Sequence, residues 1–226
     1  MWAALIGLVG LIGWVGSASG AEDQGGAGKL SPEYLRILRD AAEDFRLENY
    51  DRVLRRLDQL DAISLETPVA LNLRGAVATS QRDFEKAITY FTKASSAAPE
   101  YFAPRFNLGE LLFLQQKYPD ARGHFEKMLE GASGARRELL IFKVFMTFLM
   151  EGNQAEATVW MDKIQFPSDT PAYYFAKAAM EFRAGKPAAA EEWVATSMRV
   201  FDKQANDLYI ESFIDVGWVS KPKLGN

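Results

Sequence analysis

Cysteine is absent from the 226-residue sequence, and histidine occurs only once, as His124. The lack of cysteine excludes disulfide bonds, thiolate metal ligands and cysteine nucleophiles. A zinc site needs three or four clustered ligands, and no group of side chains has the spacing for one. We therefore expect no metal and no cofactor, and we expect His124 to be a surface residue.

Signatures of catalysis are also missing. There is no glycine loop of the kind that cradles phosphate, no G-x-S-x-G and no H-E-x-x-H. Carboxylates such as Asp40, Glu43 and Asp44 lie in polar stretches with arginines nearby, which is typical of an ion-paired, solvated helix face. The sequence thus predicts no catalytic residues and a protein that is not an enzyme.

Basic residues are not in excess. The chain has 26 lysines and arginines against 30 acidic residues, for a formal net charge of −4. A protein that binds nucleic acid through its phosphates needs a clustered positive surface. We therefore expect no nucleic acid among the partners.

Charged side chains are absent from the first twenty residues, and residues 1–15 are nearly all apolar. This run is short for a membrane-spanning helix, which needs about 20 residues. Small residues at Ala18, Ser19 and Gly20 suit a cleavage site, so residues 1–20 are predicted to be a secretory signal peptide, with a flexible linker at 21–29. The signal peptide predicts export to the periplasm or secretion, with only transient membrane contact. Because a positively charged start is missing, a retained membrane anchor is the alternative.

An internal repeat organises the next part of the chain. Residues of the same kind recur after 34 positions, and small residues alternate with aromatic ones. Small residues let two helices approach closely and aromatic residues fill the space beside them, so we expect these positions to pack the repeats together. The predicted packing residues are Gly75, Ala87, Phe91, Gly109, Ala121 and Phe125.

These blocks resemble the tetratricopeptide repeat family. The first has the family's glycine at Gly75, its turn aromatic at Phe84 and its closing proline at Pro99, and the second has Leu108-Gly109 and Tyr118. Weaker blocks extend the resemblance over residues 30–201. It implies an all-α, right-handed α-solenoid of about five helix-turn-helix repeats.

Helix boundaries are marked by capping residues and breakers. Ser31-Pro32-Glu33 is a favourable helix start, and Thr67-Pro68 marks a break. No sustained two-residue alternation occurs, so no sheet is expected. Residues 202–226 are predicted to form a capping segment, with an amphipathic helix that contains Tyr209 and Phe213, ends near Gly217 and is anchored by Trp218.

The resemblance also implies a concave groove lined by the first helix of each repeat. The positions assigned to it are polar in the N-terminal repeats and rich in phenylalanine and methionine in the C-terminal ones, which suits an amphipathic helix or an extended apolar peptide. Two arrangements are compatible with this pattern: an open groove, or one that the C-terminal segment fills as ordinary core. The predicted groove residues are Asn72, Phe106, Glu110, Phe113, Phe142, Met146, Phe175 and Phe182.

The resemblance implies a scaffold that binds a polypeptide, and the predicted signal peptide implies that this scaffold is exported. Some family members hold an acidic C-terminus in a clamp of cations, but of the corresponding positions only Asn107 matches, and that mode is excluded. The alternative function is a membrane-anchored assembly factor that retains the N-terminal segment. The sequence predicts neither the partner nor the oligomeric state.

Overall fold

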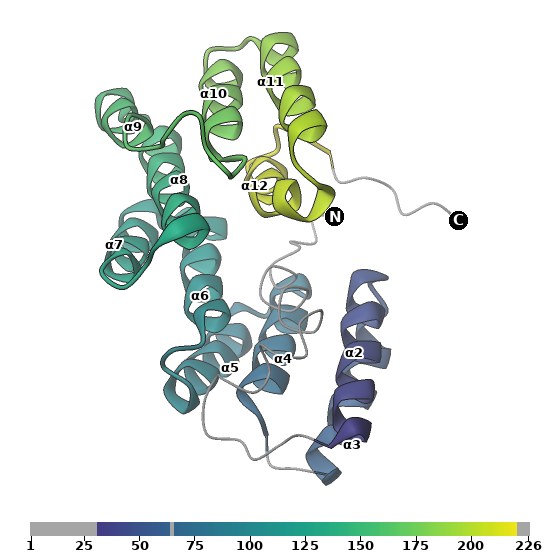
Figure 1. Ribbon diagram of the computed structural model, residues 1–226. Coiled ribbons are helices and arrows are strands. Elements are labelled where there is room, and N and C mark those ends of the chain that lie inside the picture. The colour runs from purple at the N-terminus through teal and green to yellow at the C-terminus, as the bar shows by residue number, and fades with distance from the viewer. Residues whose placement is uncertain (1–30, 64–65, 221–226) are drawn as a thin grey trace. The chain divides into compact units, whose positions relative to one another are not determined.

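The structure, a computed structural model, describes residues 31–63 and 66–220. The predicted signal peptide (1–20) and linker (21–29) lie outside the described residues. Within the described part every regular element is a helix, and none is long and apolar enough to cross a membrane (Figure 1). The helices are α2 (Pro32–Arg46), α3 (Tyr50–Ile63), α4 (Pro68–Ser80), α5 (Phe84–Ala97), α6 (Phe102–Leu114), α7 (Tyr118–Leu129), α8 (Gly134–Glu151), α9 (Gln154–Met161), α10 (Ala172–Arg183), α11 (Pro187–Val200) and α12 (Lys203–Asp215).

The expected all-α helical-repeat fold is confirmed. The helices follow one another as five pairs, with α12 after the fifth. The 34-residue period is visible in the helix starts, because α4 and α6 begin at residues 68 and 102, and α5 and α7 at 84 and 118. Ser31 and Thr67 cap α2 and α4, accepting hydrogen bonds from the backbone nitrogens of Tyr34 and Ala70 at 3.1 and 3.3 Å.

The turn inside each pair has one backbone device in common. The residue two positions before the second helix has a left-handed conformation, with φ between 59° and 87°. Such a φ is favourable for glycine and costs free energy for other residues. The five residues are Glu48, Arg82, Gln116, Gly152 and Gly185, so only the last two are glycine.

The described residues form two compact units, which meet in the sequence at Leu111–Leu112. In the first unit, α2 packs on α3 and α4 packs on α5. Gly75 of α4 lies directly against Phe91 of α5, because a Cβ atom at Gly75 would be 2.5 Å from Cε1 of that ring. Ala87 and Phe91 are fully buried, so the small residue and the aromatic side chain together set the close approach of α4 and α5.

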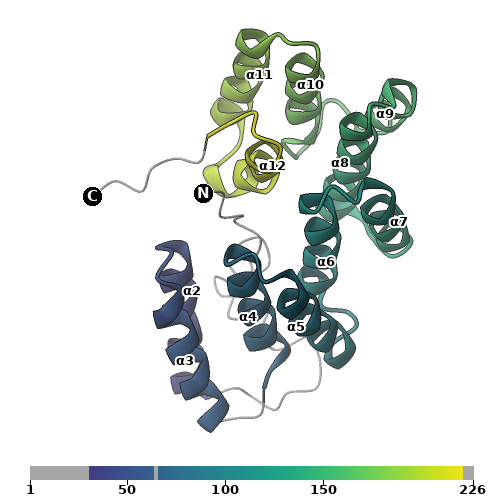
Figure 2. The same ribbon diagram turned by 180° about the vertical axis from the view of Figure 1, so that it is seen from behind.

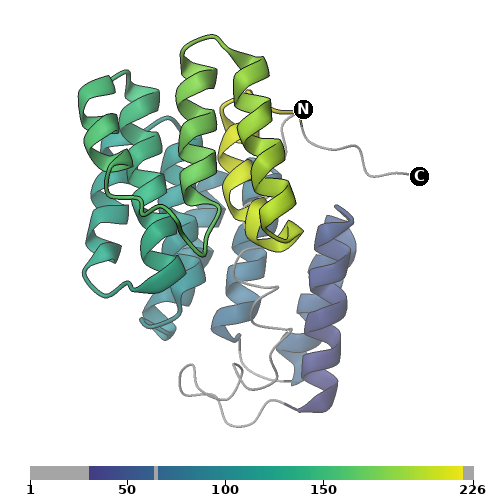
Figure 3. The same cartoon turned by 45° about the horizontal axis from the view of Figure 1, so that its top comes forward.

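In the second unit α8 is the central helix, and it packs against α7, α9, α10 and α12. Ala121 and Phe125 of α7 are fully buried. Figures 1 and 2 show α12 nearly end-on beside α8, α10 and α11, so α12 crosses these helices instead of running alongside them. Figure 3 shows the same helix lying behind the pair α10–α11. The C-terminal helix therefore covers one face of the last repeats.

Candidate partner-binding site

The C-terminal half of the predicted groove lies on α8 and α10. Phe142 and Met146 are one helical turn apart on α8, and Phe175 and Phe182 are seven residues apart on α10, so each pair lies on one helix face. Phe142, Met146 and Phe175 are fully buried, and Phe182 is half-buried at the rim. We call Phe142, Met146, Phe175 and Phe182 the apolar stripe.

Helix α12 occupies the apolar stripe with aromatic rings. The ring of Tyr209 lies 5.0 Å from that of Phe142 and 5.5 Å from that of Phe175. The ring of Phe213 lies 5.3 Å from Phe175 and 5.4 Å from Phe182. Of the two arrangements that the sequence left open, the structure shows the filled one. In this conformation the stripe is therefore not an open surface.

Trp218 closes the rim, just beyond the end of α12. Its ring stacks on that of Phe182 at a centroid distance of 5.3 Å and meets the ring of Phe213 at 5.4 Å. Gly217 precedes it with a φ of 80°, a left-handed conformation that ends the helix and turns the chain toward Phe182. The predicted anchor residue thus contacts the stripe from its exposed edge.

A buried hydrogen bond also joins α8 to α12. Lys143 of α8 and Ser212 of α12 are both fully buried, and Lys143 Nζ donates to Ser212 Oγ at 2.7 Å. A lysine ammonium can only donate, so it requires acceptors wherever it is buried. Burying a lysine is unfavourable unless such acceptors are provided. The pair therefore fixes which residue of α12 faces Lys143.

The N-terminal end of α12 is held at the corner with α11. Asn206 accepts a hydrogen bond from Ser197 Oγ at 2.6 Å, and its Nδ2 donates to the carbonyl oxygens of Phe201 and Asp202 at 3.0 and 2.8 Å. Asp202 caps α12 by accepting from the backbone nitrogen of Ala205 at 2.8 Å. These hydrogen bonds, around the buried Ser197 and Asn206, fix how the chain leaves α11 and enters α12.

A second polar cluster joins the start of α8 to the segment before α10. Glu138 accepts hydrogen bonds from the hydroxyls of Ser168, at 2.6 Å, and Thr170. Burial raises the pKa of the neighbouring Tyr209 hydroxyl, and a hydrogen bond with Thr170 opposes that effect. The hydrogen bonds of Glu138 with Ser168 and Thr170 thus hold the segment before α10 against the start of α8.

The remaining predicted groove residues are also buried. Asn72 of α4 accepts a hydrogen bond from Asn107 Nδ2 of α6 at 2.9 Å. The ring of Phe106 stacks on that of Phe102 at 5.4 Å, and that of Phe113 meets Tyr118 at 5.3 Å. The exposed fractions of Asn72, Phe106, Glu110 and Phe113 do not exceed 2%. Their role in binding a partner stays a prediction.

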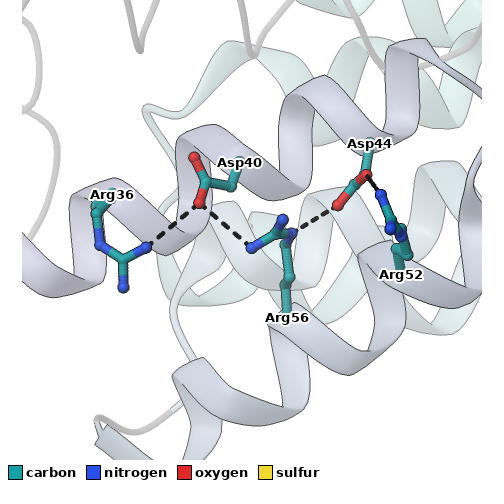
Figure 4. A network of polar contacts seen from close by, with 5 residues as sticks. All are labelled: Arg36, Asp40, Asp44, Arg52 and Arg56. Carbon is teal, nitrogen blue, oxygen red and sulfur yellow. Dashed lines mark hydrogen bonds and ion pairs between the residues drawn. The ribbon is translucent and has the colours of Figure 1, made fainter.

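A network of ion pairs joins α2 to α3 in the first unit (Figure 4). Arg56 lies between two carboxylates, with Nε 2.6 Å from Asp44 Oδ2 and Nη1 3.3 Å from Asp40 Oδ2. Arg36 and Arg52 flank the network at 3.4 and 3.7 Å from Asp40 and Asp44. The ion pairing expected from the sequence is present, but Asp44 is 5% exposed and belongs to the helix interface.

An aromatic cluster that was not predicted from the sequence lies on the surface of the second unit. Phe166 is 59% exposed, and its ring lies 4.3 Å from that of Tyr173. Tyr174 extends the cluster, because its ring centroid lies 6.3 Å from that of Trp193 and 6.0 Å from that of Phe201. The available signal was the concentration of aromatic residues around the break at residues 167–171, outside the packing positions of the repeat.

No group of three or more potential metal ligands occurs in the part of the chain that the structure describes. His124 is half-buried, with its ring edge-on to Phe125 at 6.2 Å. The polar clusters of the second unit connect helices to each other. The candidate site is therefore the apolar stripe, which α12 covers with aromatic rings and with a hydrogen bond to Lys143.

Comparisons with known proteins agree with this architecture. Residues 78–136 match the family model described as Tetratricopeptide repeat. Among curated proteins none matches the sequence. The crystal structure of a tetratricopeptide repeat protein from Parabacteroides merdae ATCC 43184 is similar over 90% of this chain and 76% of that chain, with a TM-score of 0.62 and 16% sequence identity. At this identity the likeness shows the fold alone.

Proposed function

We propose that this chain, which contains tetratricopeptide repeats, is a non-catalytic scaffold that binds an amphipathic helix of a partner polypeptide on the apolar stripe of α8 and α10. Tetratricopeptide repeats generally mediate protein–protein interactions. One observation carries the choice of surface: the stripe already holds an amphipathic helix, α12. Its shape and chemistry therefore suit a helix.

The contacts that α12 makes are those of a helix bound in a groove. Tyr209 and Phe213 are one helical turn apart and place their rings between Phe142, Phe175 and Phe182. Amphipathic helices bind apolar grooves through anchors with this spacing. Aromatic anchors in desolvated pockets contribute most of the binding free energy in such interfaces.

The compartment that we propose is the periplasm or the exterior of the cell. It rests on the uncharged, apolar residues 1–20 and on the absence of cysteine, which suits a chain exposed to an oxidising environment. The alternative is a membrane-anchored assembly factor. Mass spectrometry of the protein from its native host distinguishes the two, because cleavage near Gly20 removes the apolar segment and an anchor retains it.

Site-specific crosslinking tests the proposed surface. A photoreactive phenylalanine analogue would replace Phe182, at the half-buried rim of the stripe, in the full chain in its native host. The matched control would carry the analogue at Phe166, which is exposed and lies outside the stripe. We expect a polypeptide to crosslink at position 182 and not at 166. Crosslinking at 166 alone would place recognition on the surface aromatic cluster instead.

The two fully buried stripe residues supply a quantitative check. Phe142→Ala and Phe175→Ala should each reduce the yield of the crosslink at position 182, because each removes a ring that would contact the incoming helix. Ile88→Ala, an exposed site on α5, should leave the yield unchanged. Equal yields in all three variants would contradict binding on the stripe.

A further inference from the structure

We propose that α12 is an exchangeable internal ligand, and that the partner helix replaces it by presenting two aromatic residues four positions apart with a hydrogen-bond acceptor directly before the second. This inference rests on the proposed function and specifies the ligand of the same site. The pattern is that of Tyr209, Ser212 and Phe213, which are the first aromatic, the acceptor and the second aromatic.

The two aromatic positions follow from the ring contacts. Residues i and i+4 lie on the same face of a helix, one turn apart. Tyr209 contacts both Phe142 of α8 and Phe175 of α10, and Phe213 contacts both Phe175 and Phe182 of α10. A competing helix must supply a ring at each position, because a smaller side chain would leave the stripe incompletely covered.

The acceptor position follows from Lys143. This residue lies next to Phe142 in the sequence, has no exposed surface and donates to Ser212 at 2.7 Å. A helix with an apolar residue at this point would remove this hydrogen bond from the buried ammonium, so a helix that offers an acceptor here is favoured. A serine or threonine hydroxyl or a carboxylate can supply this acceptor. Lys143 therefore discriminates among helices that carry the same aromatic residues.

The same lysine makes α12 easier to release than an ordinary core helix. Covering a charged side chain requires the removal of its water, so a buried polar contact adds less stability than apolar packing of equal size. When α12 leaves the stripe, water can take the place of Ser212 beside Lys143. A polar contact within a largely apolar interface is thus suited to specific recognition that remains reversible.

The α11–α12 corner determines how the exchange proceeds. Asn206 bonds Ser197 and the carbonyls of Phe201 and Asp202 at one end of α12, whereas beyond the other end Trp218 contacts the stripe from the exposed rim. We infer that the Tyr209–Trp218 portion leaves first while the corner stays formed. The corner keeps α12 close to its site, so a partner must outcompete a ligand at high effective concentration.

The test uses a fluorescent peptide with the sequence of residues 203–220 and the full chain, followed by fluorescence anisotropy. Phe213→Ala weakens the internal helix without changing the stripe, so the peptide should bind this variant at least ten times more tightly than the unaltered chain. A peptide in which Tyr209 and Phe213 are both alanine is the control and should not bind. Failure of the unaltered peptide to bind the folded Phe213→Ala chain would overturn the proposal.

A second comparison isolates Lys143. A peptide carrying Ser212→Ala should bind the Phe213→Ala chain at least five times more weakly than the unaltered peptide. That difference should disappear when the chain also carries Lys143→Met. Equal loss in both chains would overturn the role assigned to Lys143. If circular dichroism shows that Phe213→Ala does not fold, Trp218→Ala, which alters only the rim, takes its place in both experiments.

The outcomes separate this inference from the proposed function. If a partner crosslinks at position 182 but the peptide does not bind, the scaffold function stands and the internal-ligand inference is wrong. If the peptide binds with the expected dependence on Lys143 but no polypeptide crosslinks at position 182, the stripe accepts only α12 and the proposed function is wrong.

Discussion

The first and second units use one helix-pair plan but different contacts between helices. In the first, arginines bridge acidic residues: Arg56 joins α3 to α2 through Asp44, and Arg74 joins α4 to α3 through Asp61 at 2.5 Å. In the second, α8, α10 and α12 meet through rings, and a lysine–serine hydrogen bond joins α8 to α12. The small and aromatic packing residues of the repeat thus determine which helices pair. The other residues at the helix interfaces can form either ion pairs or ring contacts.

The two kinds of contact respond to different conditions. Ion pairs near the surface weaken in salt and contribute little when both partners are exposed. Ring contacts are insensitive to salt and lose their stabilising effect when a ring is removed. Substitutions in each unit should therefore destabilise the protein by different amounts and with different dependence on salt.

The largest effect is expected at the stripe. Phe175→Ala should lower the free energy of unfolding by about 3–5 kcal/mol, because Phe175 is fully buried between the rings of Tyr209 and Phe213. Phe166→Ala is the matched control, and since Phe166 is 59% exposed its cost should stay below about 1 kcal/mol. Urea denaturation measures both. Similar costs for the two variants would mean that α12 does not cover the stripe.

A smaller loss is expected where α4 meets α5. Gly75→Ala should cost about 1–3 kcal/mol, because the added Cβ would lie 2.5 Å from the buried ring of Phe91. Gly123→Ala in α7 is the control: nothing lies within 4 Å of its Cβ, and alanine favours the helix by about 0.5–1 kcal/mol. The two substitutions should therefore shift the melting temperature in opposite directions. A neutral Gly75→Ala would contradict the close helix contact.

The ion-pair network should show a dependence on salt. Asp44→Asn should cost about 1–2 kcal/mol at low salt, a value discounted because its partners Arg56 and Arg52 are partly exposed. Part of that cost should vanish in 1 M NaCl. Glu43→Gln, which breaks the exposed pair with Arg46, should cost under about 0.5 kcal/mol. If the loss of unfolding free energy in Asp44→Asn is the same at low salt and in 1 M NaCl, Asp44 stabilises the protein through packing and not through its charge.

Each unit also contains a buried tyrosine that makes stability depend on alkaline pH. Burial raises the pKa of Tyr101 in the first unit and of Tyr209 in the second. The unfolded chain loses these protons near pH 10 while the folded chain keeps them, so stability falls as pH rises above about 10. Tyr101→Phe and Tyr209→Phe should each reduce that slope, by up to about 1.4 kcal/mol per pH unit. Denaturation at pH 9 and pH 11 provides the comparison, and an unchanged slope would contradict burial of the hydroxyl.

The repeat register could be predicted from the sequence because local residues determine it. Gly75 and Phe91 recur 34 positions later as Gly109 and Phe125, and helix starts with proline or capping residues follow the same period. The helix α12 was likewise visible in the spacing of Tyr209 and Phe213. These features depend on contacts within a repeat or within one helix.

The state of the groove could not be predicted, because it depends on distant residues. Lys143 and Ser212 are 69 positions apart, and nothing in either segment indicates the other. The burial of Asp44 depends on Arg56 of the next helix, so the local pattern of charges suggested a solvated face. Arg82 and Gln116 give no sequence signal of their left-handed conformation, unlike Gly152 and Gly185.

Amide hydrogen exchange of the full chain tests most directly whether α12 is held as a ligand on the stripe. Exchange in local opening events is faster than exchange that requires global unfolding. We expect the amides of residues 209–215 to exchange faster than those of α10. We also expect Phe142→Ala to increase the amide exchange rates of α12 while leaving those of α4 unchanged. Exchange of α12 and α10 at one common rate, shifted equally by Phe142→Ala, would show that α12 is an inseparable part of the core and would contradict the account.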